Sequence, residues 1–126
     1  EQAVSDDEAV RLLAPYLTAV AGKREGSMML AALGMEKTPR RALIGVMGVM
    51  QAALRDAIFR AEGLREPPLQ PALAKQSEAL ASALTPERLL AFYDFTDELV
   101  HRISRNAASA AVTCALTSDV YRICYQ

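Results

Sequence analysis

The amino-acid sequence predicts an all-α domain, a compact bundle of about six helices. Apolar residues make up 52% of the 126 residues, and glycine and proline number only six each. That composition favours a packed core over disorder. Apolar residues recur at three- and four-residue spacings along most of the chain, as in amphipathic helices. No window alternates apolar and polar residues between turn signals, so strands are not expected. A chain of this length fits one domain.

A capping box predicts the start of the first helix, because the Ser5 hydroxyl can accept a hydrogen bond from the Glu8 amide. Val4 occupies the position of a hydrophobic staple. Pro15 lies inside the helical pattern and has no N–H to donate, so a kink or an early stop is expected there. Gly22 is expected to close the helix. Its buried face comprises Ala9, Leu13, Tyr16, Leu17 and Val20.

A short helix is predicted over residues 28–33, between a turn at Gly26 and a stop at Gly34. Met28 and Met29 flank this glycine-containing turn. Methionine fills irregular gaps in cores and also makes adaptable binding surfaces. Of the five methionines these two are the better candidates for partial exposure, although filling of the core is the favoured interpretation.

A long helix is predicted next, with Thr38 as N-cap, Pro39 at the first helical position and a C-cap at Gly63. Gly45 and Gly48 lie opposite its apolar stripe, and each costs about 1 kcal/mol relative to alanine in a helix. We expect a neighbouring helix to pack closely on this side, which would make the long helix central. The apolar stripe comprises Leu43, Val46, Met47, Met50, Leu54, Ala57, Ile58 and Ala61.

Residues 64–71 contain three prolines and are expected to form a loop or short hinge within the single domain. A modest helix follows over residues 73–84, and Thr85-Pro86 starts the next helix. Asn106 is expected to break the chain and to act as N-cap of the last helix. The two apolar stripes comprise Leu89, Phe92, Tyr93, Thr96, Leu99, Val100 and Ile103, and then Ala108, Val112, Ala115, Leu116, Val120 and Ile123.

Charge and motifs give little support to catalysis or to direct DNA binding. The 14 basic and 15 acidic residues leave a net charge of -1, whereas DNA binding needs a dense basic face. No nucleotide-binding, zinc-protease or calcium-loop motif is present, so no catalytic, cofactor or metal residue is assigned. His101 lies near Asp94, Asp97 and Glu98 and could ligate a metal with them. A solvated helix face is the favoured interpretation.

The two cysteines and the hydropathy pattern predict a cytoplasmic protein. Cys114 and Cys124 would lie about 15 Å apart along one helix, too far for a disulfide, and free thiols are typical of a reducing compartment. The longest apolar stretch, residues 42–50, is too short to span a bilayer. No signal-peptide pattern is present. The chain does not start with Met and is expected to be a piece of a longer one.

The last helix offers the best candidate for a partner interface. Cys114, Tyr121 and Tyr125 lie opposite its apolar stripe, and aromatic residues with polar tips suit protein interfaces. Coverage by another helix of the same domain is an equally weighted alternative. Arg40 and Arg41 open a helix, where positive charge is unfavourable for the helix dipole. They are either a contact with an acidic partner or phosphate or, as favoured, ordinary surface.

A second hypothesis is an all-α ligand-binding regulatory domain. Its pocket would be lined by Met47, Met50, Phe92 and Tyr93. Such a site needs a cavity of about 300 Å³ or more with convergent polar groups. A close-packed interior at these residues would remove this hypothesis.

Several stretches resemble the collar domain of the bacterial DNA polymerase III clamp loader. Residues 40–50 and 53–58 resemble its long helix, in which a leucine-rich run and a Leu-Arg-Asp triplet precede a proline-containing loop. Residues 84–90, Leu-Thr-Pro-Glu-Arg-Leu-Leu, are similar to the start of the following helix. Residues 105–107, Arg-Asn-Ala, resemble the step before the final helix. The resemblance covers roughly residues 39–123, and its motifs are helical and apolar.

Among clamp-loader subunits the chain is most similar to delta prime, with gamma/tau next. The resemblance implies a C-terminal oligomerisation domain that follows an AAA+ module in a longer chain. Collars of sister subunits pack together in a ring and hold the ATPase modules in the spiral that opens the sliding clamp. The implied partners are the other clamp-loader subunits, with DNA reached only indirectly through the complex and no membrane involved. No catalysis and no cofactor are implied for this domain itself.

Overall fold

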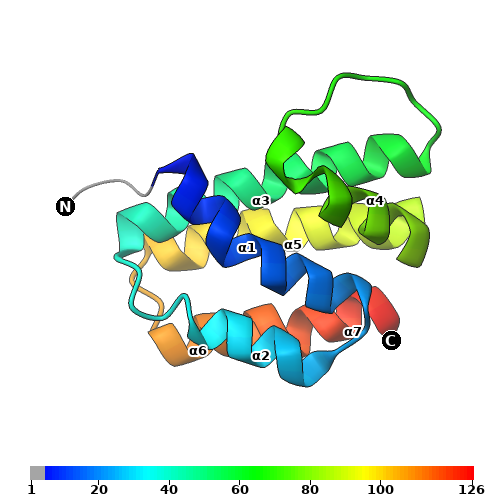
Figure 1. Ribbon diagram of the computed structural model, residues 1–126. Helices are drawn as coiled ribbons and strands as arrows, with labels where there is room; N and C mark the ends of the chain where they lie inside the picture. The colour runs from blue at the N-terminus through cyan, green and yellow to red at the C-terminus, as the bar shows by residue number, and fades with distance from the viewer. Residues whose placement is uncertain (1–4) are drawn as a thin grey trace.

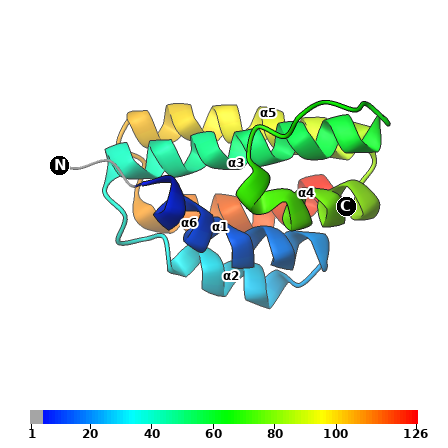
Figure 2. The same ribbon diagram turned by 45° about the horizontal axis from the view of Figure 1, so that its top comes forward.

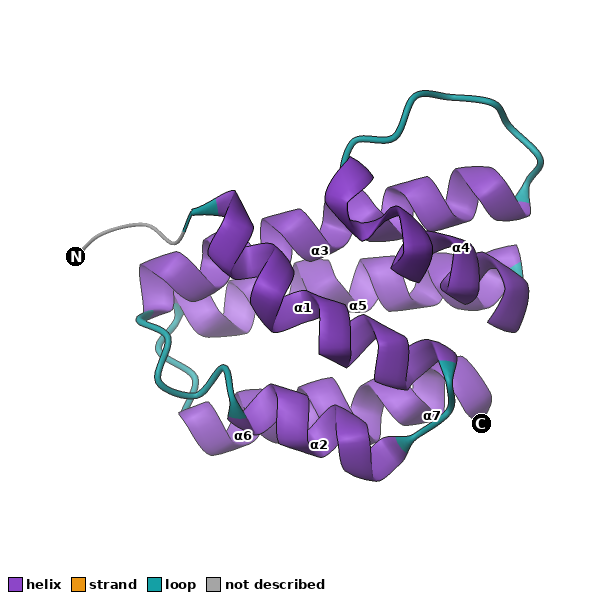
Figure 3. Cartoon of the chain, in the orientation of Figure 1, coloured by secondary structure: helices purple, strands orange, loops and turns teal. Residues whose placement is uncertain are grey.

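The computed structural model describes residues 5–126, which fold into six helical rods without a strand (Figures 1 and 3). The last rod is continuous but contains a π-helical segment, η2, between two α-helical halves. In chain order the elements are α1 (Asp6–Ala21), α2 (Glu25–Leu33), α3 (Arg40–Ala61), the 3-10 turn η1 (Pro71–Leu73), α4 (Ala74–Ala83), α5 (Pro86–Ser104), α6 (Ser109–Cys114), η2 (Ala115–Asp119) and α7 (Val120–Tyr125). The predicted all-α class and the number of helices are confirmed.

The two longest helices, α3 and α5, lie side by side and form one layer of the bundle (Figures 1 and 2). Helix α4 covers one end of α3, and α1 crosses the layer and contacts α2, α3 and α4. The rod α6–η2–α7 packs between α2 and the α5 side. The largest fully buried side chains are Leu13, Tyr16, Leu17, Met28, Met35, Met47, Met50, Leu54, Leu73, Leu80, Leu89 and Phe92.

Two of the predicted helix starts are confirmed by their caps. The Glu8 amide donates to the Ser5 hydroxyl over 3.3 Å, and the Arg88 amide donates to the Thr85 hydroxyl over 3.2 Å. The Thr38 cap is wrong, because Pro39 is extended and itself precedes the first helical residue, Arg40. Thr38 instead belongs to the turn after α2. The staple residue Val4 lies outside the described residues.

Three helices end in the same motif, with a residue of positive φ just beyond the helix. These residues are Lys23 (φ 58°), Gly63 (φ 74°) and Asn106 (φ 63°). In each case the amide of this residue and the amide of the next residue donate to carbonyls of the last helical turn, the pattern of a Schellman motif. Asn106 therefore breaks the chain as predicted, but it terminates α5 and does not cap α6. The residue before α6 is Ala108, whose backbone is extended and whose side chain makes no cap.

Of the other local predictions, some are confirmed and some are wrong. Pro15 does not stop α1, which continues to Ala21, and Gly22 follows its last residue as predicted. Helix α2 begins at Glu25, three residues earlier than predicted. Burial of the stripes is confirmed for most positions, but Ala108 is exposed. Phe95, outside the predicted stripe, is buried.

The packing prediction was wrong for the face of α3 that carries Gly45 and Gly48. Helix α3 is central, as expected, and contacts α1, α4 and α5. Gly45 and Gly48, however, are not covered, and a Cβ built on either would meet no atom within 4 Å. The three neighbours pack on other faces of α3, so no helix of the described chain approaches this side.

By length and composition α3 is apolar enough to cross a membrane, although 50% of its most apolar stretch is buried inside the bundle. The core helix of a soluble protein has the same property. This feature is therefore weak evidence for a membrane span.

Candidate interaction surface

Three large apolar side chains project from two turns of α2. Met29, Leu30 and Leu33 are 48%, 72% and 45% exposed, and we name them the α2 ridge. The opposite face of α2 is anchored in the core by Met28 and Ala32, which are fully or almost fully buried. Single exposed leucines are ordinary, but a cluster of this kind marks an interaction surface.

The sequence pattern only partly indicated the α2 ridge. Met29 is exposed as expected, whereas Met28 is buried, so the expectation for the pair is half right. Leu30 and Leu33 were missed because residues 28–33, the part of α2 after its polar first turn, are all apolar. A helix of that kind normally signals complete burial.

A small pocket lies beside the last turn of α2, where that helix, the start of α3, the end of α5 and the start of α6 meet. We name it the end pocket. Its volume is about 160 Å³. Its apolar lining comes from Met35, Leu43, Ile103, Val112 and Leu116, and its polar lining from Glu36, Thr38, Arg40, Asn106, Ser109 and Thr113.

Two side-chain contacts hold the walls of the end pocket together. The Arg40 guanidinium donates to the Asn106 side-chain oxygen and, over 3.5 Å, to the Ser104 carbonyl. It thereby ties the start of α3 to the end of α5. On the other wall the Thr113 hydroxyl donates to a Glu36 carboxylate oxygen over 2.8 Å. The pocket is thus framed by residues from segments far apart in the sequence.

The predicted interface residues fall in two places. Arg40 lines the end pocket, and Arg41 beside it is exposed and already takes part in an interaction. Tyr125 lies at the far end of the last rod, where its hydroxyl donates to the Val20 carbonyl over 2.5 Å. The structure therefore does not bring the five predicted residues into one patch.

Contacts within the chain occupy much of the interface predicted at Cys114, Tyr121 and Tyr125. The rings of Tyr121 and Tyr125 are 5.5 Å apart, and the Lys23 ammonium lies 5.5 Å from the Tyr125 ring. Both tyrosines are half-buried, whereas Cys114 is exposed. The alternative that another helix of the domain covers this side thus holds in part for Tyr125.

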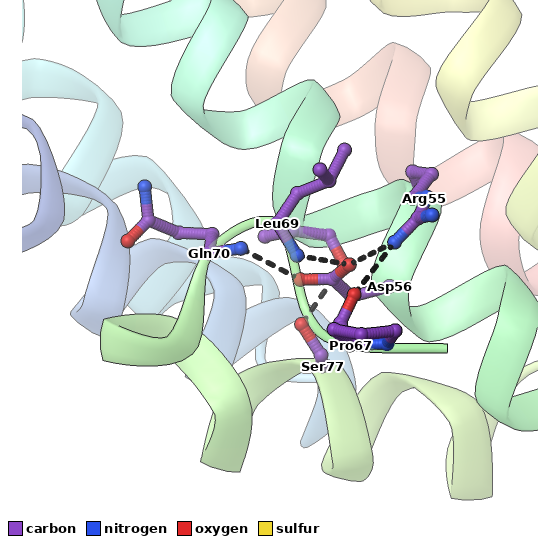
Figure 4. Close-up of polar contacts among 7 residues, drawn as sticks. Arg55, Asp56, Pro67, Leu69, Gln70 and Ser77 are labelled. Atoms are coloured by element: carbon purple, nitrogen blue, oxygen red, sulfur yellow. Dashed lines mark hydrogen bonds and ion pairs between the residues drawn. The ribbon is translucent and has the colours of Figure 1, made fainter. Parts of the chain in front are cut away.

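Asp56 fixes the proline-containing loop that connects α3 to η1 (Figure 4). One carboxylate oxygen accepts from the Leu69 amide and the other from the Gln70 amide, each over 2.9 Å. Arg55 donates to Asp56 over 3.0 Å and to the Pro67 carbonyl over 3.2 Å. The Arg55 guanidinium also lies 4.0 Å from the centre of the Phe59 ring. The Asp56 side chain is only 4% exposed, so these partners satisfy a buried charge.

The buried hydroxyl of Tyr16 stabilises the π-helical segment. In η2 the Val120 amide bonds to the Ala115 carbonyl, five residues back, so it does not satisfy the Leu116 carbonyl as it would in an α-helix. The Tyr16 hydroxyl donates to that carbonyl over 2.6 Å. Burial raises the pKa of Tyr16 well above its usual value, with a smaller contribution from Cys124.

The side chains that could ligate a metal or act as nucleophiles are dispersed over residues 5–126. No group of three or more His, Cys, Asp or Glu side chains could hold a metal there, and His101 is exposed. Burial raises the pKa of the Cys124 thiol to about 12, which keeps it protonated and unreactive at neutral pH. Met47, Met50 and Phe92 are fully buried in the core. Neither these three residues nor the half-buried Tyr93 lines the end pocket or the two other pockets, which lie beside Leu12 and Phe59.

Comparison with protein-family models, with curated proteins and with solved structures found no match for this chain.

Proposed function

We propose that this chain is a protein–protein assembly module, the collar domain of a bacterial clamp loader of the delta-prime type. The observation that carries the assembly role is the α2 ridge, three large apolar side chains exposed next to a pocket. Clusters of exposed apolar side chains mark protein interaction sites. The narrower identification rests on the sequence stretches that resemble the collar.

The Asp56 contacts give a physical role to one of those stretches. In the collar-like run at residues 54–56, Arg55 and Asp56 both bond to the loop that follows α3. A Leu-Arg-Asp triplet before a proline-containing loop is thus suited to fixing that loop. This role is structural and supports an assembly module better than it supports a catalytic one.

The test is to mix the chain with purified clamp-loader subunits and to measure the mass of the product by light scattering after size-exclusion chromatography. We expect a stable complex at micromolar concentration. The double variant Leu30→Glu/Leu33→Glu should abolish it, because two charges would be buried against the partner. Leu90→Glu, a matched change of an exposed leucine on α5, should leave it intact.

Two results would count against this proposal. Absence of any complex with the full set of clamp-loader subunits would refute the collar assignment. A complex that forms equally well with the double variant would refute the role of the α2 ridge. Circular dichroism and thermal unfolding of each variant would verify that the fold is retained.

A further inference from the structure

The end pocket combines an apolar floor with a polar rim. The floor includes Met35, Ile103 and Leu116, all buried, and the rim is formed by the Arg40 guanidinium, the Asn106 side chain and the exposed Ser109. Pockets of this kind receive the anchor side chains that carry most of the binding energy in protein interfaces.

The size of the end pocket favours one side chain over a free ligand. Sites for metabolites and cofactors usually enclose about 300–1,000 Å³, whereas this pocket measures about 160 Å³. That volume is on the scale of a single leucine, methionine or phenylalanine side chain. The occupant is therefore expected to be part of a larger partner whose remaining contacts lie outside the pocket.

The charges around the rim favour an acidic occupant. Five basic residues line the pocket or adjoin its lining residues in the chain, and Glu36 is the one acidic residue that does either. The Glu36 carboxylate already accepts the Thr113 hydroxyl. The five basic residues are Lys37, Arg40, Arg41, Arg102 and Arg105, of which Arg102 pairs with Glu98 over 3.1 Å. A neighbouring hollow adds Arg11 and Glu8, whose charges offset each other.

The α2 ridge leads directly to this pocket. Ala32, in the last turn of α2, and Glu36, in the turn that follows this helix, line the pocket. The ridge residue Leu33 lies between them in the chain. A partner helix lying along α2 would cover the ridge and reach the pocket with one side chain.

We infer that the end pocket receives one large apolar side chain of an amphipathic partner helix that carries a carboxylate next to this anchor, paired with the basic rim. This inference rests on the proposed assembly function, since it names the chemistry of the partner at that surface. The apolar anchor would supply affinity, and the carboxylate would set orientation through Arg40 and its basic neighbours.

The test uses three small probes with the same leucine-like tail: 4-methylpentanoate, 4-methylpentan-1-ol and 4-methylpentan-1-amine. Binding to the full chain is followed by amide chemical shifts in nitrogen-15 NMR spectra. We expect shifts at Thr38, Asn106, Ala107 and Ser109. The carboxylate should bind about fivefold more tightly than the amine, the effect of roughly 1 kcal/mol from exposed charges.

Matched variants show whether the shifts come from the pocket. Ser109→Leu would fill the pocket from an exposed position, so it should remove the shifts. Ser118→Leu places the same side chain on an exposed position that does not line the pocket, so it should leave them unchanged. Arg40→Gln keeps an amide donor for Asn106 and should reduce the affinity of the carboxylate to that of the alcohol.

The inference is overturned if no probe shifts these amides, or if the amine binds as tightly as the carboxylate. Its outcome is separable from that of the collar proposal. If clamp-loader subunits do not bind the chain but the carboxylate probe maps to the pocket, the collar assignment fails and the pocket stands. If the complex forms and Ser109→Leu leaves its affinity unchanged, the pocket inference fails and the collar assignment stands. For the complex with clamp-loader subunits, we expect Ser109→Leu to lower the affinity about 30-fold, which is equivalent to about 2 kcal/mol of binding free energy.

Discussion

At the scale of single residues, the Tyr16 hydroxyl is the polar group whose removal has the clearest expected cost. It is buried and satisfies the Leu116 carbonyl, which the π-helical hydrogen-bonding pattern leaves without its usual partner. Replacing this tyrosine by phenylalanine keeps the ring and removes one donor. A buried carbonyl would then lack a hydrogen bond.

Tyr16→Phe should lower the free energy of unfolding by about 1–3 kcal/mol, the usual cost of leaving a buried polar group unsatisfied. Urea denaturation followed by circular dichroism measures this change. Tyr93→Phe is the matched control, because Tyr93 is only half-buried, and it should change stability much less. Equal effects of the two substitutions would show that the Tyr16 hydrogen bond does not support η2.

At the scale of elements, α3 carries two glycines that its surroundings do not require. Gly45 and Gly48 lie within the regular helix, and the space that a Cβ would occupy at either position is open. Gly63, just past the same helix, adopts a φ of +74° that favours glycine. The three positions therefore form an internal comparison within one element.

Gly45→Ala and Gly48→Ala should each raise the free energy of unfolding by about 0.5–1 kcal/mol, because alanine loses less backbone entropy in a helix. Gly63→Ala should lower it, since a Cβ is unfavourable at positive φ. Thermal or urea unfolding of the three variants would measure these changes. Destabilisation by the two helix substitutions would indicate that the face is packed against something in solution.

The loop between α3 and η1 is expected to depend on Asp56. Asp56→Asn removes the charge and one of the two oxygens that accept the Leu69 and Gln70 amides. A loss of about 1.5–3 kcal/mol is expected for hydrogen bonds to a charged group. Trypsin should cleave after the exposed Arg65 faster than in the unchanged protein. Asp94→Asn, on an exposed face of α5, is the control. Similar cleavage rates in both variants would contradict the role of Asp56 in fixing the loop.

Helices and their apolar stripes were predictable because burial in a bundle repeats with the helical period. The caps at Ser5 and Thr85 were predictable because their side chains act locally. The positive φ of Lys23 was not, since lysine gives no local signal for that conformation. The loop fixed by Asp56 and the π-helical segment supported by Tyr16 depend on contacts between distant residues, which periodicity does not encode.

The candidate surface was predicted only in part, at Met29 and at Arg40. The prediction at Arg40 has a physical reason. The sequence placed this residue at the start of a helix, where its charge is locally unfavourable. The structure gives it a compensating contact with Asn106 and a place on the pocket rim. Leu30 and Leu33 of the α2 ridge could not be predicted, because residues 28–33 are all apolar and do not reveal which face the bundle leaves uncovered.

At the scale of the whole molecule, the exposed apolar surface is local and not general. The accessible surface of 6923 Å² is close to the roughly 6,600 Å² expected for a monomer of 13.7 kDa. The fold thus hides its core about as well as other monomers do. The proposed assembly role therefore depends on the exposed side chains of α2, because the bundle as a whole exposes no excess of surface.

Stability of the whole bundle should decline in alkali. Burial raises the pKa of Cys124 from 9.0 to about 12 and raises that of Tyr16 well above 10.0. The native state therefore holds protons that the unfolded state releases, so stability is complete below about pH 9 and falls between pH 9 and 12. Urea unfolding at a series of pH values measures this decline. Cys124→Ala should flatten the curve; an identical slope would contradict the role of the thiol.

The widened turns at Ala115–Asp119 also fix the rotational phase of the final helix. Each residue of an α-helix advances the chain by about 100°, and η2 accommodates one residue more than an α-helical turn because the Val120 amide bonds five residues back. Deleting one residue within η2 would therefore leave a regular α-helix, with Cys124 still in the interior and Tyr125 still close to Val20. A deletion in the regular turns of the rod would instead rotate everything beyond it, so a change of length is best tolerated at the π-helical segment.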